Sequence, residues 1–217
     1  MRQTAYLMAA RLRLPLFVLL SLVSLHACLF VLQPMLSSLK TLDILGLAVL
    51  AGSLVRAFSC GIADVINEVY GLAAARLNVL VSMMVRLLGW LVIGLVVVLP
   101  GTVKDEAFLG SLFISFRLVV AGLIGLVVIE WWLDATLFDW LKRKLPVGFW
   151  FRHNLTNALN HLLGSLLVLT IGFYGTGRPI VAVAVGGLVA KLVLGAALTP
   201  VFAGAAKLLK PLGSKTL

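Results

Sequence analysis

Long apolar runs constrain this chain more than any other feature, because they recur along almost its whole length. Charged residues make up 12% of its 217 residues, which is about half the share found in a soluble domain. A run of about 20 apolar residues can cross a bilayer as a helix. Runs of this kind lie at about 14–34, 43–63, 77–99, 107–133, 155–174 and 179–206. The sequence therefore predicts an all-α integral membrane protein, a bundle of six transmembrane helices.

The segments between these runs are short and contain turn residues such as Pro100-Gly101 and Gly175. They leave no room for a second folded unit. We therefore expect residues 1–217 to form a single six-helix membrane domain.

Basic residues are distributed unevenly over the two sides of this six-helix prediction. Where loops are short, an excess of lysine and arginine marks the cytoplasmic side. One side carries Arg2, Arg11, Arg13, Arg76, Lys142, Arg143, Lys144, Arg152, Lys207, Lys210 and Lys215, and the other carries Lys40, Lys104 and Arg178. Both termini are therefore predicted to be cytoplasmic, in a multi-pass protein of the bacterial inner membrane. The net charge of +10 then indicates contact with the lipid bilayer rather than with nucleic acid.

A second group of charged residues lies within the runs or at their ends. The bases of this group are Arg56, Arg86, Arg117 and Lys191, and the acids are Asp64, Glu68, Glu130 and Asp134. A charge in the hydrocarbon region costs a few kcal/mol unless it is compensated. The four bases are therefore predicted to pair with acids and hold the helices in register. The alternative for a base in mid-span is to neutralise a substrate carboxylate, and Arg117 and Lys191 are the candidates for that role.

Polar side chains from three runs are expected at the same depth, near the cytoplasmic side. Asp64 and Glu68 are four residues apart and share a helix face. The further members of this group are Asn67, Tyr70, Glu130, Asp134, Asn154, Thr156, Asn157, Asn160 and His161. Their convergence predicts a polar cavity near the cytoplasmic side. The alternative is that the acids are solvated at the interface and only help to end their helices.

Two tryptophans, Trp131 and Trp132, precede Asp134. Tryptophans near the end of a span usually belong to the interfacial belt. The alternative is an aromatic wall for a flat ligand, with the acids at its edge.

Motifs for catalysis or energy coupling are not found in the sequence. There is no Walker loop, no HExxH motif and no nucleophile elbow, and the two cysteines lack the spacing of a metal site. We therefore predict no catalytic residue, no metal, no cofactor and no enzymatic activity.

The segment from Ala63 to Gly71, ADVINEVYG, resembles the D-x-x-(T/N)-E-x-Y-G signature of the queuosine precursor transporter family, also called the vitamin uptake transporter family. Similar features follow in the family's order over roughly residues 43–202. They are Arg117, Asp134 with Phe138, the segment Arg152-His153-Asn154-Leu155-Thr156, Lys191 and Thr199-Pro200. The resemblance implies a six-helix solute transporter, similar in fold to the substrate-binding components of energy-coupling-factor transporters.

The resemblance also implies a function, the uptake of 7-cyano- or 7-aminomethyl-7-deazaguanine by alternating access. A carboxylate can accept the amidine-like N–H edge of such a ring. The substrate-binding residues predicted on this basis are Asp64, Asn67, Glu68, Tyr70, Trp131, Asp134, Asn154, Asn157 and His161. The chain departs from the family's pattern at Arg56-Ala57, Trp131, His161 and Gly164, so a related but different solute stays open.

Two other functions remain as alternatives at this stage. The chain could be the vitamin-capture subunit of an energy-coupling-factor transporter, working with a separate energising partner. It could also be a membrane scaffold that transports nothing. The sequence leaves the coupling ion open, as well as the presence of a homodimer.

Overall fold

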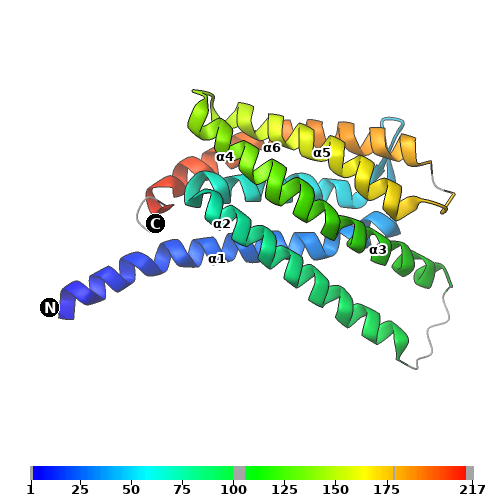
Figure 1. Ribbon diagram of the computed structural model, residues 1–217, viewed down its shortest axis with the longest axis horizontal. Coiled ribbons are helices and arrows are strands. Elements are labelled where there is room, and N and C mark those ends of the chain that lie inside the picture. The colour runs from blue at the N-terminus through cyan, green and yellow to red at the C-terminus, as the bar shows by residue number, and fades with distance from the viewer. Residues whose placement is uncertain (1, 100–105, 178, 214–217) are drawn as a thin grey trace.

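The computed structural model describes residues 2–99, 106–177 and 179–213. It shows an elongated bundle of helices with one small β-hairpin (Figure 1). The elements are α1 (Arg2–Leu39), β1 (Thr41–Ile44), β2 (Leu47–Leu50), α2 (Ala51–Val98), α3 (Glu106–Gly125), η1 (Leu126–Asp134), α4 (Ala135–Lys144), α5 (Phe149–Phe173) and α6 (Ile180–Gly213). Three basic residues used to predict the orientation, Lys104, Arg178 and Lys215, lie outside the described residues.

Five helical stretches in the described residues are long and apolar enough to cross a membrane. They are Leu14–Leu39, Ala51–Val98, Phe108–Lys144, Phe149–Phe173 and Ile180–Pro211. Large apolar side chains are exposed along them, for example Phe17 on α1, Leu91 on α2 and Val181 on α6. Exposed apolar surface on this scale is stable only against another apolar medium. The predicted all-α membrane class is confirmed.

Helix α2 contains two of the predicted spans and changes direction between them. Gly71 interrupts it with φ 85° and ψ 177°, a conformation that glycine adopts without the steric cost of a side chain. In Figure 1 the first part of α2, in cyan, and the second part, in teal to green, run in opposite directions along the bundle. The predicted turn at Gly71 thus separates residues 51–70 from residues 72–98.

The prediction of a helix from residue 43 is wrong for its first eight positions. Strands β1 and β2 pair there in antiparallel register, with Thr41 opposite Leu50. The two residues of the turn, Leu45 and Gly46, both have positive φ, 55° and 79°, which is the pattern of the tight turns that join paired strands. The backbone N–H of Gly46 also donates a hydrogen bond of 2.9 Å to Asp43 Oδ1. Turn geometry therefore overrides the apolar composition, and the helix begins at Ala51.

The fourth predicted span, 107–133, is the start of a longer helical unit. Helix α3 continues into the π-helix η1 and then into α4, so that helical structure extends from Glu106 to Lys144. A π-helix is wider than an α-helix and often occurs at functional sites. In this chain η1 carries Glu130 and Asp134, both buried.

The two ends of the bundle are formed by different elements. The β-hairpin is at one end, whereas the turn at Gly71, the end of α4, the start of α1 and the end of α6 are at the other (Figure 1). We call these the hairpin end and the Gly71 end. Buried apolar residues of α1, α2 and α6, among them Val23, Ile66 and Phe202, form a core toward the Gly71 end. A second core, with Leu118, Leu169, Phe173 and Val183, lies toward the hairpin end.

Candidate functional site

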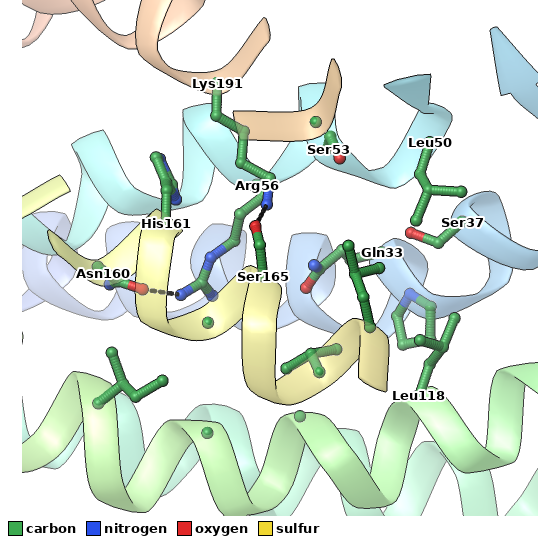
Figure 2. A pocket seen from close by; sticks show the side chains of 18 of the residues that line it. Gln33, Ser37, Leu50, Ser53, Arg56, Leu118, Asn160, His161, Ser165 and Lys191 are labelled. Carbon is green, nitrogen blue, oxygen red and sulfur yellow. Dashed lines mark hydrogen bonds between the residues drawn. The ribbon is translucent and has the colours of Figure 1, made fainter. Parts of the chain in front are cut away.

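A cavity lies inside the bundle, between the middle and the hairpin end. Its walls come from α1, β2, both parts of α2, α3, η1, α5 and α6. Its polar and charged lining residues are Gln33, Ser37, Ser53, Arg56, Arg86, Glu130, Asn160, His161, Ser165 and Lys191. Figure 2 shows Lys191 reaching Ser165 and Arg56 reaching Asn160, so that side chains of α2 and α6 both meet α5 at the cavity. Seven helices and strands thus surround one polar hollow within an apolar bundle.

An ion pair between Arg56 and Glu130 joins α2 to η1 at the cavity wall. The Arg56 Nη2 also donates a hydrogen bond of 3.1 Å to Asn160 Oδ1, and Asn160 Nδ2 donates one of 3.0 Å to Asp134 Oδ2. The guanidinium lies over the Phe30 ring, 4.8 Å from its centre. Because all these polar groups are buried, the four residues form a fixed network rather than a surface contact.

One segment, η1, supplies two acids because Glu130 and Asp134 are four residues apart and share its inner face. Glu130 and Asp134 are buried together with Leu126 and Ile129, whereas Trp132 is 66% exposed. The exposed Trp132 agrees with a place in an interfacial belt. One face of η1 therefore carries two carboxylates into the bundle, and the opposite face meets the surroundings.

Two further cations line the cavity without an acidic partner in the described residues. Lys191 Nζ donates a hydrogen bond of 3.0 Å to Ser165 Oγ (Figure 2). Arg86 Nη2 donates one of 3.2 Å to the backbone carbonyl of Leu118. Glycine at position 122 leaves the space that this guanidinium fills, since a Cβ there would lie 2.5 Å from Arg86 Nη2. Both side chains are thus held in place by neutral oxygen atoms.

His161 lies on the same wall, on α5, one residue after Asn160 (Figure 2). It is 2% exposed, and its Nε2 atom has no hydrogen-bond partner in the described part of the chain. A buried ring nitrogen without a partner is costly in a folded protein. His161 therefore presents unused hydrogen-bonding capacity at the cavity.

Toward the Gly71 end, the polar residues are engaged with one another. Asp64 Oδ2 lies 2.6 Å from His153 Nδ1, and both side chains are buried. Asn157 Nδ2 lies 2.9 Å from the same ring nitrogen, and the Phe149 ring stacks on the His153 ring with 5.6 Å between centroids. This group closes the space between α2 and α5.

The layer nearest the Gly71 end is built around Glu68. Arg152 Nη2 donates a hydrogen bond of 2.7 Å to Glu68 Oε2, and Lys142 and Lys210 each lie 3.8 Å from a carboxylate oxygen of Glu68. Lys142 Nζ also donates to the backbone carbonyl of Glu68 at 2.8 Å. Three cations from α4, α5 and α6 therefore meet one carboxylate of α2.

Nine residues were predicted to bind substrate, and all nine lie in the described part of the chain. His161 lines the cavity, whereas the other eight do not. Asn67 donates to the carbonyl of Ala135 at 2.9 Å, and Tyr70 donates to that of Pro15 at 3.1 Å. Asn154 donates to Thr199 Oγ1 at 3.1 Å. Trp131 packs beside Arg76, whose guanidinium lies 6.0 Å from a ring centre of Trp131. The other four, Asp64, Glu68, Asp134 and Asn157, lie in the networks described above.

The four bases predicted as structural partners of acids are used in different ways. Arg56 forms the ion pair with Glu130. Arg117 donates hydrogen bonds of 2.8 Å to the carbonyls of Ile171 and Tyr174, where α5 ends. Arg56, Arg86 and Lys191 line the cavity, whereas Arg117 does not.

Several lining residues were not predicted as part of the site, above all Gln33, Ser37, Ser53 and Ser165. Single serines and amides in apolar runs usually reflect helix packing, so they are a weak signal. Asn160 was expected among the polar residues of its span but was not counted as substrate-binding. Along α5, Asn157, Asn160, His161 and Ser165 follow each other at helical intervals, and adding Ser165 to this polar face would have extended it along the cavity wall.

A bundle of long helices that exposes apolar side chains along its length, with charged residues held in its interior, defines a multi-pass membrane protein. Residues 50–205 match the family model described as "Putative vitamin uptake transporter", which covers well over half of the chain. The protein belongs to this family of small-molecule transporters, as its signature segment predicted. No curated protein and no solved structure matches the chain significantly.

Proposed function

We propose that this protein imports a small, flat, polar heterocycle of the 7-deazaguanine class across the bacterial inner membrane. The substrate binds in the cavity between α2, η1, α5 and α6, and access alternates between the two sides of the membrane. In this proposal the chain is one domain of six spans, with the two parts of α2 counted separately. Both termini are cytoplasmic, so that the hairpin end faces outward.

The observation that carries the proposal is the polar cavity itself, formed inside a member of a transporter family. Its wall offers the carboxylate of Glu130, the amide of Asn160 and the imidazole of His161 close together on η1 and α5. A 7-deazaguanine presents an amidine-like N–H edge and a carbonyl oxygen, which such groups can bind with charge-assisted hydrogen bonds. Orienting one flat ring needs few polar contacts when the rest of the pocket is apolar.

The predicted substrate-binding residues outside the cavity have a place in this mechanism. The layers around Asp64 and Glu68 lie between the cavity and the cytoplasmic side. In the proposal they close the inner path in the state described here and separate when the substrate leaves. Asn67, Tyr70, Trp131, Asp134, Asn154 and Asn157 border this path and meet the substrate on its way inward.

The first test is thermal unfolding of the purified protein with 7-cyano-7-deazaguanine, 7-aminomethyl-7-deazaguanine and a set of vitamins. A ligand at 100 times its Kd stabilises the folded state by about 2.7 kcal/mol, which is readily seen as a higher Tm. We expect a rise with a deazaguanine. A rise with a vitamin alone would instead favour the vitamin-capture subunit, and no rise with any compound would favour the scaffold.

The second test measures uptake of the labelled ligand into proteoliposomes by the variant Glu130→Gln. We expect uptake to fall at least tenfold, because the amide accepts a weaker hydrogen bond and leaves Arg56 without its charge partner. The matched control is Glu106→Gln, at the exposed start of α3, which should transport as the parent does. Equal uptake by the two variants would contradict a role for the cavity.

A further inference from the structure

Basic side chains outnumber acidic ones among the residues that line the cavity. Arg56, Arg86 and Lys191 are basic, and Glu130 is the acid among the lining residues of the described chain. With histidine neutral, the lining has a formal charge of +2. Since the walls exclude most water, this excess acts on a bound molecule more strongly than it would in solution.

The excess is located at two of the three cations. Arg56 is compensated by Glu130. Lys191 and Arg86 have only the hydroxyl of Ser165 and the carbonyl of Leu118 as hydrogen-bond acceptors in the described residues. Neutral oxygen atoms orient a cation but do not cancel its charge.

Two other buried acids of this region, Asp64 and Asp134, contact groups other than Lys191 and Arg86. Asp64 is bound to His153, and Asp134 receives a hydrogen bond from Asn160. Neither residue lines the cavity. Lys191 projects from α6 into the hollow from the side opposite η1 and reaches Ser165 on α5 (Figure 2). No acid of the described chain forms an ion pair with it.

Charges in the apolar part of a membrane are retained when something compensates them. We infer that Lys191, placed by Ser165, forms an anion subsite that binds a carboxylate on the transported molecule. The carboxylate compensates the charge of Lys191 and accepts a hydrogen bond from its ammonium group. The unpartnered Nε2 of His161, on the same wall, is a further polar contact for the bound molecule. This subsite rests on the proposed function, because it lies in the same cavity.

The test uses one ring with three side groups at position 7. The 7-carboxy, 7-cyano and 7-aminomethyl forms of 7-deazaguanine carry an anionic, a neutral and a cationic group on the same scaffold. Affinities are measured by calorimetry or by thermal shift with the purified full-length protein. We expect the 7-carboxy form to bind at least tenfold more tightly than the 7-cyano form, and the 7-aminomethyl form to bind most weakly.

Variants of Lys191 then assign the preference to this residue. Lys191→Met keeps the length of the side chain and should remove the preference, so that the 7-carboxy and 7-cyano forms bind to this variant within threefold of each other. Lys191→Arg keeps the charge and should retain the preference. Lys207→Met, an exposed lysine on the same helix, is the matched control and should bind all three as the parent does.

A second pair of probes, nicotinate and nicotinamide, separates the subsite from the identity of the ring. If no deazaguanine binds, the proposed substrate is wrong, and the subsite still predicts that nicotinate binds more tightly than nicotinamide. The inference is wrong if no carboxylate binds more tightly than its neutral counterpart. It is also wrong if Lys191→Met leaves the preference unchanged.

Discussion

The cavity and the Gly71 end of the bundle both contain buried charges, but they use them differently. At the Gly71 end, Asp64 meets His153, and Glu68 meets Arg152 with two lysines nearby. In the cavity, Arg56 is the cation with an acidic partner, whereas Lys191 and Arg86 contact neutral oxygen atoms. The acids at the Gly71 end are thus paired with bases and join helices, whereas two cavity cations, Lys191 and Arg86, have no acidic partner in the described residues. In our proposals the ligand lies beside these unpaired cations.

The largest expected effect comes from breaking the ion pair between Arg56 and Glu130 in the cavity wall. Arg56→Met leaves Glu130 buried without its cation and should lower the free energy of unfolding by about 3–5 kcal/mol. The double variant Arg56→Met/Glu130→Leu should recover most of the loss, because it leaves no single charge behind. Both are measured by denaturant titration in detergent. A double variant no more stable than Arg56→Met would show that the pair does not account for the loss.

The next effect tests the packing of the Gly71 end. A Cβ on Gly61 would overlap the Phe202 ring, so Gly61→Ala should separate α2 from α6 and destabilise the protein by about 1–3 kcal/mol. The control is Gly195→Ala, since nothing lies near a Cβ at that position of α6. This control should be neutral or more stable by up to about 1 kcal/mol. Equal stabilities of the two variants, compared by thermal unfolding, would mean that the two helices are not in close contact at Gly61.

The smallest expected effect sharpens the contrast between paired and unpaired cations. Lys191→Met removes a charge that has no acidic partner in the described chain. In the absence of ligand it should leave the free energy of unfolding unchanged or raise it by about 1 kcal/mol, in contrast to Arg56→Met. A loss of more than 2 kcal/mol, measured in the same titration, would show that Lys191 has a structural role.

Much of the fold follows from the sequence, because the length of an apolar run decides whether it can span a bilayer. The helices at Phe149–Phe173 and Ile180–Gly213 lie close to the predicted spans. The turn at Gly71 was also predicted, because a glycine that follows an apolar run is a turn signal. The β-hairpin was missed because residues 43–50 are apolar enough to continue a helix, and the turn at Leu45 and Gly46 is a weak signal by comparison.

The site was harder to predict than the fold. Asp64 and Glu68 stand out in the sequence, yet they lie outside the cavity, whereas Arg56 and Lys191 line it. In a soluble protein the polar face of a helix points to water, so its inner face can be deduced. In a membrane bundle both lipid and core are apolar, so the inward side of a helix is marked only where several polar residues share one face, as on α5.

The sequence by itself determined that the chain spans a membrane, roughly where its apolar helices lie, and which family it belongs to. Those properties depend on local composition and on one segment that resembles the family signature, ADVINEVYG. Only the tertiary structure decided which charges are paired and which line the cavity. That outcome depends on how helices distant in sequence rotate against one another, as when Arg56 of α2 meets Glu130 of η1 and Lys191 of α6 meets Ser165 of α5.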